Sequence, residues 1–296
     1  VDRLSDRSIP VTFLNARRTR DAPRAIVELK RYFQQLRPAL VQSFLAHANI
    51  AASLAARAAG LRPTVSGIRV AERRTNLHAW LARSTERWVA KHVCVSHSVA
   101  EFAIHDMRLD PRKVMVIPNG VDVEMIAKAE AISREELGLP ADAQMLLHVG
   151  RLDPQKRIDW LLGRFAEALP KIPNAYLLLA GAGPLQDELK QLAAQMGIAE
   201  RVRFLGWRSD VPRLLESCDA LVMTSAWEGM PNAVLEAMAA AKPVLVTEVE
   251  GVREILGSLA TEQIVSREDR TGFVERLVGL LRDTELAKER GEANRA

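Results

Sequence analysis

Residues 220–236 read Ala-Leu-Val-Met-Thr-Ser-Ala-Trp-Glu-Gly-Met-Pro-Asn-Ala-Val-Leu-Glu, and this stretch indicates the fold class. Its first four residues are a short apolar run typical of a buried strand, and residues 232–240 have the pattern of a helix. The loop between them contains Gly229 and Pro231, residue types that interrupt regular structure. The stretch therefore predicts a strand, a loop and a helix in succession.

The same alternation continues through the rest of the second half of the chain. Further strands are predicted at 145–149, 175–180, 202–205 and 243–246, and further helices at 158–169, 185–196 and 211–216. Short apolar strands alternating with helices form parallel sheets that are covered on both faces. Ligands of such sheets bind beyond the carboxyl ends of the strands. We therefore expect an α/β fold with its site in the loops that follow the strands.

The first half of the chain shows a looser version of this pattern. Strands are predicted at 39–44, 64–68, 93–96 and 113–117, and helices at 24–36, 48–59, 77–90 and 98–107. The turn sequence Pro118-Asn119-Gly120 then separates the two halves, because Asn and Gly tolerate positive φ. A chain of 296 residues commonly holds two domains, and we predict them at 1–122 and 123–296.

The composition is that of a globular protein, with an uneven distribution of charge. Apolar residues make up 48% and charged residues 26% of the chain, and no run of about 18 apolar residues is present. The two cysteines, Cys94 and Cys218, lie in or beside apolar runs and are predicted to be packed, reduced thiols, which favours a cytoplasmic location.

Residues 1–120 hold 20 Lys and Arg against 9 Asp and Glu, whereas residues 121–296 hold 21 against 28. The basic half suggests an anionic partner such as phospholipid or a phosphorylated acceptor, although a merely solvated surface fits equally well. The arginines concerned are Arg17, Arg18, Arg20, Arg24, Arg31, Arg37, Arg69, Arg73, Arg74, Arg83 and Arg87. Nucleic acid is disfavoured because aromatic residues do not alternate with these arginines.

Three loops after strands contain residues that could bind a ligand. The loop 150–157 places Arg151 and Lys156 after a predicted strand, and this pair of cations suits a diphosphate, with a solvated basic loop as the alternative. Both look like flexible cations outside the core. The Gly181-Ala182-Gly183 sequence is a weaker signal and is interpreted as turn chemistry.

The loop 224–231 is the most specific of the three. Glu228 lies in the loop and Glu236 about one turn into the following helix, so that these carboxylates could accept hydrogen bonds from the hydroxyls of a sugar and a ribose. Gly229 and Met230 precede the helix, where backbone N–H groups favour a bound anion.

Taken together, Glu-Gly-Met-Pro-Asn-x-x-x-Glu at 228–236 and Gly-Arg-Leu-x-x-x-Lys at 150–156 resemble family 4 of the retaining glycosyltransferases. The resemblance implies a GT-B fold, in which two Rossmann-like parallel-sheet domains face a cleft. It implies that the first domain serves the acceptor and the second binds a nucleotide sugar, linked to UDP or GDP. The implied donor-binding residues are Arg151, Lys156, Leu205, Gly206, Glu228, Gly229, Met230, Pro231, Asn232 and Glu236.

Within that set the resemblance assigns the catalytic roles to Glu228, Arg151 and Lys156. No metal and no cofactor are expected, because no Asp-x-Asp sequence accompanies these loops. The leaving diphosphate itself would take the acceptor proton, with attack on the same face of the sugar. The acceptor would be a saccharide or a lipid-linked molecule, with peripheral contact at the inner face of an anionic membrane.

The chain also departs from the family pattern. Nothing before Pro10 resembles the first strand and Gly-rich loop of the family, which suggests a first domain lacking its start. Gln42-Ser43-Phe44 stands where a His-x-His is common, and His47 is a candidate replacement near the acceptor and sugar. Two alternatives therefore stay open, a non-catalytic nucleotide-sugar-binding fragment and a nucleotide-sugar epimerase of the same fold.

Overall fold

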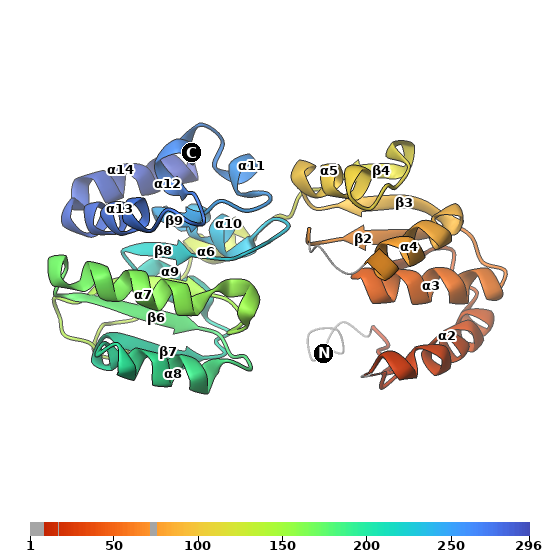
Figure 1. The fold of residues 1–296 in the computed structure, drawn as a ribbon, viewed down its shortest axis with the longest axis horizontal. Coiled ribbons are helices and arrows are strands. Elements are labelled where there is room, and N and C mark those ends of the chain that lie inside the picture. Colours follow the sequence, from red (N-terminus) through yellow and green to blue (C-terminus); the bar gives the residue numbers. More distant parts are fainter. Residues whose placement is uncertain (1–8, 17, 72–75) are drawn as a thin grey trace. The chain divides into compact units, whose positions relative to one another are not determined.

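The computed structural model describes residues 9–16, 18–71 and 76–296. They divide into two compact units (Figure 1). Of the described residues, the first unit holds 9–16, 18–69, 76–94 and 100–117, and the second holds 70–71, 95–99 and 118–296. Arg17, Arg73 and Arg74 of the basic half lie outside the described residues.

The first unit contains a four-stranded parallel sheet in the order β1-β2-β3-β4. Its strands are β1 (Val41–Phe44), β2 (Thr64–Ile68), β3 (Val89–Cys94) and β4 (Val114–Val116). The helices of this half of the chain are α2 (Ala22–Leu36), α3 (Ala46–Ala58), α4 (Asn76–Thr85) and α5 (His97–His105).

One predicted helix of the first half was too long. The helix predicted over 77–90 ends at Thr85, and a 3-10 turn, η2 (Glu86–Trp88), leads into β3. Val89 is 4% exposed and pairs with Thr64 of β2. The Thr64 hydroxyl donates to the Trp88 carbonyl over 2.7 Å. Tertiary pairing with β2 therefore outweighs the helical preference of this segment.

The second unit contains a six-stranded parallel sheet in the order β10-β9-β8-β5-β6-β7. The strands are β5 (Gln144–Val149), β6 (Ala175–Ala180), β7 (Val202–Gly206), β8 (Ala220–Met223), β9 (Val244–Thr247) and β10 (Ile264–Val265). Five of them agree closely with the sequence prediction. β10 was not predicted, since two residues are too short for a recognisable apolar run.

Helices of the second unit precede, connect or follow these strands. They are α6 (Val123–Ala127), α7 (Ile158–Ala168), α8 (Gln186–Gln195), α9 (Val211–Ser217), α10 (Asn232–Ala239), α11 (Val252–Leu256), α12 (Ala260–Gln263), α13 (Arg270–Arg282) and α14 (Thr284–Arg295). No helix in the described part of the chain is both long and apolar enough to cross a bilayer.

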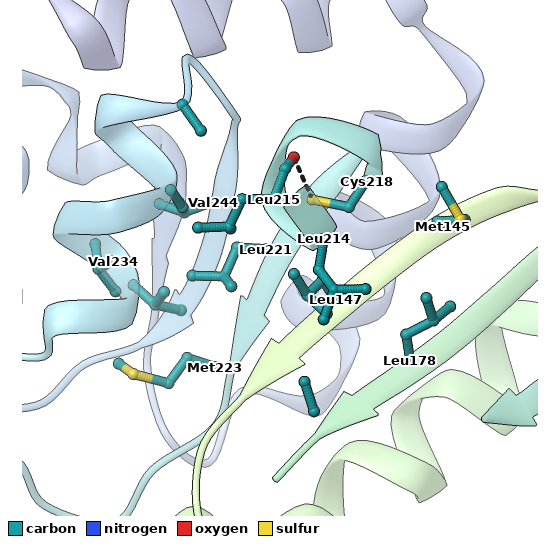
Figure 2. Packing of buried hydrophobic residues seen from close by; sticks show 14 of the residues in the cluster. Met145, Leu147, Leu178, Leu214, Leu215, Cys218, Leu221, Met223, Val234 and Val244 are labelled. Carbon is teal, nitrogen blue, oxygen red and sulfur yellow. Dashed lines mark hydrogen bonds between the residues drawn. The ribbon is translucent and has the colours of Figure 1, made fainter. Parts of the chain in front are cut away.

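The core of the second unit lies on both faces of its sheet. Figure 2 shows the cluster on one face, where side chains of β5, β8 and α9 meet. Within it Cys218 is 3% exposed and its thiol donates to the Leu215 carbonyl over 3.3 Å. Burial raises the pKa of both Cys94 and Cys218 to about 12. The prediction of packed, reduced thiols is confirmed for both.

Candidate functional site

The candidate site lies where the strand order of the second sheet reverses. After β5 the chain continues outward to β6 and β7, and it then returns to place β8 on the other side of β5. At such a switch point the loops that follow the two neighbouring strands turn to opposite faces of the sheet. Open α/β sheets bind their ligands in the crevice between these two loops. Here those loops are residues 150–157 after β5 and 224–231 after β8.

The two loops are joined by hydrogen bonds to backbone carbonyl groups. The Ala226 N–H donates to the Gln155 carbonyl over 2.7 Å, and the buried Thr224 hydroxyl donates to the Lys156 carbonyl over 3.0 Å. The Gln155 side chain donates to the Trp227 carbonyl over 2.8 Å. These bonds fix Lys156 and the Glu228 loop as one structural element.

An ion pair between Lys156 and Glu228 forms the centre of the site. The Lys156 ammonium lies 2.5 Å from Glu228 Oε1, and the two side chains are 17% and 9% exposed. The Ser225 hydroxyl donates to the same oxygen over 2.7 Å. Glu228 is therefore held in one orientation by a cation and a hydroxyl that are both largely removed from water.

The two cations of the first loop differ in their environment. Arg151 is a flexible cation, as expected, because its side chain is 71% exposed and its Nε is 3.8 Å from Asp153 Oδ2. Lys156 is not, since most of its side chain is buried and its ammonium already has a carboxylate partner. The expectation of two flexible cations is therefore wrong for Lys156.

Carbonyl groups around Glu228 are fixed by residues from distant parts of the second unit. The Ser96 hydroxyl donates to the Gly229 carbonyl over 2.8 Å, and the Ala71 N–H donates to the Glu228 carbonyl over 3.1 Å. Because a trans peptide directs its N–H away from its C=O, the N–H groups of Gly229 and Met230 are directed away from Ser96 and Ala71. Among the described residues neither of these two N–H groups donates a hydrogen bond.

Helix α10 supplies the second carboxylate. It begins at Asn232 after Pro231, and it places Glu236 half-buried in its second turn. Burial raises the pKa of the Glu236 carboxyl. Asn119, from the predicted interdomain turn, donates to the Met230 carbonyl over 2.9 Å and to Asn232 Oδ1 over 2.8 Å. Sequence reasoning treated Asn119 as a turn residue and Ser96 as a strand residue and gave neither a role in the site, since nothing in their local patterns links them to this loop.

The loops after β6 and β7 approach the same edge of the sheet. A β-carbon on Gly183 would lie 2.2 Å from the Leu152 carbonyl oxygen, and one on Gly181 would lie even closer to the Gly150 carbonyl. These glycines therefore permit close backbone contact, which agrees with their interpretation as turn residues. The Gly206 carbonyl, after Leu205 of β7, accepts a hydrogen bond from the Gly181 N–H over 2.8 Å.

His47 lies in the first unit. It is exposed and occupies the first turn of α3, directly after the β1 strand and Leu45. Its assignment to acceptor or sugar binding stays a prediction.

Two family models match the chain. The model of the group 1 glycosyl transferases matches residues 129–296, which is more than half of the chain and includes both site loops. The chain belongs to this family. A model of glycosyltransferase family 4 matches residues 3–125.

Relatives of this family member include proteins named for two different reactions. This chain is 31% identical over 220 residues to the UDP-Gal:alpha-D-GlcNAc-diphosphoundecaprenol alpha-1,3-galactosyltransferase of Escherichia coli. The match covers 71% of this chain and 56% of the relative. The chain is 29% identical over 202 residues to the N-acetyl-alpha-D-glucosaminyl L-malate synthase of Bacillus anthracis, covering 68% and 52%. The chain spans about half the length of the curated relatives it matches.

Solved structures share the fold of this chain. The Anabaena protein Alr3699/HepE in complex with UDP-glucose has a TM-score of 0.86 at 22% identity, covering 99% of this chain and 82% of that chain. The sucrose-phosphate synthase of Thermosynechococcus elongatus has a TM-score of 0.78 at 20% identity, covering 93% and 72%. The predicted GT-B fold class is confirmed, with two parallel-sheet α/β domains of four and six strands.

Proposed function

We propose that this chain transfers a sugar from a UDP-linked donor to a saccharide or lipid-linked acceptor with retention of the anomeric configuration. The observation that supports it most is the Lys156–Glu228 ion pair at the switch point of the second sheet. UDP is favoured over GDP because the Escherichia coli relative is named for UDP-Gal and the Anabaena neighbour binds UDP-glucose. The second domain, residues 123–296, would bind the donor, and residues 1–122 the acceptor.

The site residues would divide the donor between them. Arg151 is exposed and free to turn toward a diphosphate, and Lys156 would share its ammonium between that diphosphate and Glu228. The N–H groups of Gly229 and Met230 would stabilise negative charge as the diphosphate departs, since fixed donors in place before reaction need no rearrangement. Pro231 and Asn232 begin the helix behind them.

Glu228 and Glu236 would bind the two sugars. Glu228 Oε1 already accepts bonds from Lys156 and Ser225, so Oε2 is the oxygen with most capacity for a donor-sugar hydroxyl. Glu236 would accept from the ribose hydroxyls, and Leu205 and Gly206 would contact the base through their backbone. Neither carboxylate is needed as a general base, because the departing diphosphate would take the acceptor proton on the same face of the sugar.

A transfer assay tests this proposal. The chain is incubated with UDP-α-glucose or UDP-α-galactose and a panel of saccharide and prenyl-diphosphate-linked acceptors in excess EDTA, and the product is analysed by NMR. An α-linked product formed in EDTA is the expected result. A β-linked product would contradict retention, and activity that requires added Mg²⁺ or Mn²⁺ would contradict metal independence. Interconversion of the two donors would instead support the epimerase alternative.

The acceptor side would approach an anionic membrane. Of the arginines predicted to face the anionic partner, those that the structure describes are all exposed, namely Arg18, Arg20, Arg24, Arg31, Arg37, Arg69, Arg83 and Arg87. Each basic residue near an anionic leaflet contributes about 1 kcal/mol, so that several give reversible, salt-sensitive attachment. Sedimentation with vesicles of neutral and anionic lipid is the test. Equal binding to both kinds of vesicle, or none to either, would contradict the membrane proposal.

A further inference from the structure

A buried histidine lies beneath the loop that carries Lys156. His148 belongs to β5 and is 0% exposed. Its Nδ1 lies 3.1 Å from the carbonyl oxygen of Val222 on the neighbouring strand β8. A carbonyl oxygen can only accept a hydrogen bond, so Nδ1 carries the ring proton. In the neutral ring Nε2 is then a bare acceptor.

The neutral form of the ring is strongly favoured. Burial, with a smaller contribution from the positive charge of Lys156, lowers the pKa of His148 to about 4. At neutral pH the protein therefore holds an uncharged imidazole, whose one remaining polar atom is the lone pair of Nε2. That atom has no hydrogen-bond partner among the described residues. Buried polar atoms without a partner are rare in folded proteins and call for a specific explanation.

The unpartnered nitrogen and the end of the Lys156 side chain border the same space above Gly150. A β-carbon built on Gly150 would be 3.2 Å from His148 Nε2 and also 3.2 Å from Lys156 Cε. Two atoms that are each 3.2 Å from one point are no more than 6.4 Å apart. The ammonium is one bond beyond Cε, so a rotation of the last bonds of the lysine side chain can direct an N–H toward the ring. Gly150 has no side chain that would lie between them.

The hydrogen bonds of Lys156 must change if the donor binds as proposed. Its ammonium has three N–H groups, of which one is directed at Glu228 in the absence of donor. In the proposed function the ammonium turns toward a diphosphate while one N–H stays with Glu228 Oε1, and Glu228 Oε2 binds a sugar hydroxyl. The third N–H of the ammonium lies inside this buried region and needs another acceptor, because an unpaired buried donor is costly.

We propose that His148 is a positioning residue for Lys156, whose ammonium donates a hydrogen bond to His148 Nε2 when the diphosphate of the donor is bound. The inference rests on the proposed function. A neutral acceptor suits this position, because it orients the ammonium without adding a negative charge that would compete with the diphosphate. A carboxylate in its place would retain the lysine permanently.

Two substitutions of similar size test the acceptor Nε2 separately from the Nδ1–H group of His148. His148→Gln can place an amide oxygen near the position of Nε2. His148→Asn can keep an N–H directed at Val222 but has no acceptor at the Nε2 position. UDP affinity is measured by calorimetry for both variants, in the natural background and in a Lys156→Ala background. We expect His148→Asn to weaken UDP binding about tenfold, the scale of one hydrogen bond to a charged group, and His148→Gln to retain most of the affinity.

The Lys156→Ala background shows whether the effect passes through the lysine. If the effect passes through Lys156, His148→Asn causes no further loss of UDP affinity in the Lys156→Ala background. Such non-additivity is expected of two residues in contact. Equal losses in the Asn and Gln variants, or an Asn effect that persists without Lys156, would overturn the inference. If Lys156→Ala alone leaves UDP affinity unchanged, the role of Lys156 in the proposed function fails first.

A measurement on the unaltered protein does not depend on whether the variants fold. The ¹⁵N chemical shift of His148 Nε2 is recorded by NMR with and without saturating UDP. The expected result is the shift of a bare, unprotonated nitrogen in the free protein and a move toward the hydrogen-bonded value when UDP is added. An Nε2 signal that UDP leaves unchanged, or a proton on Nε2 in the free protein, would overturn the inference.

Discussion

The Lys156 ammonium lies 2.5 Å from Glu228 Oε1, although the two residues are 72 positions apart in the chain. Both belong to loops that follow neighbouring strands, and both are largely buried. In the absence of ligand the cation and the carboxylate thus neutralise each other. A nucleotide sugar can interact with both partners at once, since its diphosphate attracts the lysine and its hydroxyls donate to the carboxylate.

Alanine substitutions of Arg151 and Lys156 are expected to affect stability differently. Both should weaken nucleotide-diphosphate binding, each by roughly 1.5–3 kcal/mol for a lost charge-assisted hydrogen bond. Arg151→Ala should leave the free energy of unfolding unchanged, because the side chain is 71% exposed. Lys156→Ala should lower it by about 3 kcal/mol, because a buried carboxylate loses its cation.

Calorimetry with UDP and urea unfolding measure the two quantities on the same samples. Arg151→Ala serves as the control for Lys156→Ala, since both remove one positive charge from the same loop. If Lys156→Ala unfolds at the same urea concentration as the unaltered protein, the buried ion pair does not stabilise this fold.

Close packing of the loops after β5 and β6 predicts a severe effect at Gly183. A methyl group there would meet the Leu152 carbonyl oxygen at 2.2 Å, so Gly183→Ala should destabilise the second unit by several kcal/mol. Gly279→Ala is the matched control, because Gly279 lies within α13 and has nothing within 4 Å of the added carbon. That control should be stabilising by about 0.5–1 kcal/mol. Equal unfolding temperatures for the two variants would contradict the described approach of the loops.

Acidification is expected to destabilise both units through their buried histidines. Burial lowers the pKa of His148 and of His92 to about 4, with added effects of Lys156 and of Lys113 respectively. Glu86 is 3.8 Å from His92 Nε2, too far to offset its burial. Between pH 6.5 and 4 the unfolded chain binds more protons than the folded one, so stability falls as pH falls.

The loss should approach about 3 kcal/mol per histidine at the lower end of this range. Urea unfolding of the unaltered protein and of His148→Gln between pH 7 and pH 5 measures it. The unaltered protein should lose stability across the interval, and the variant should lose less. A stability that is constant or increases toward pH 5 would contradict the neutral, buried state of these rings.

Local patterns were sufficient to predict most strands and the loops of the site. The strands β6 and β8 are continuous apolar runs, and β5 is mostly apolar with His148 near its end. All three end at glycine or at a small polar residue, and so their carboxyl ends could be located from the sequence. Resemblance to a family motif then drew attention to Arg151, Lys156 and Glu228. The helix α14 was not predicted, because its residues are mostly polar and it is held by tertiary contacts such as the hydrogen bond from Gln263 to Asn294.

Partners within the site could not be predicted in the same way. The ion pair of Lys156 with Glu228 depends on β5 and β8 being neighbours, and that order follows from the whole sheet rather than from either loop. The same holds for Ser96 and Asn119, which bond the carbonyls of Gly229 and Met230 from more than 100 residues away in the sequence. His148 was included in a predicted strand as one more strand residue, and only its contact with Val222 distinguishes it.

The most direct test of the central claim compares UDP with a UDP-sugar as ligands of the Glu228→Gln variant. In our account Glu228 contacts the donor sugar but not the diphosphate. Its ion pair with Lys156 holds the ammonium back from the diphosphate. Calorimetry should therefore show UDP affinity unchanged or increased in the variant, and UDP-glucose or UDP-galactose affinity reduced by about tenfold. Equal reductions for UDP and for the UDP-sugar, or no binding of either ligand by the unaltered protein, would contradict the account.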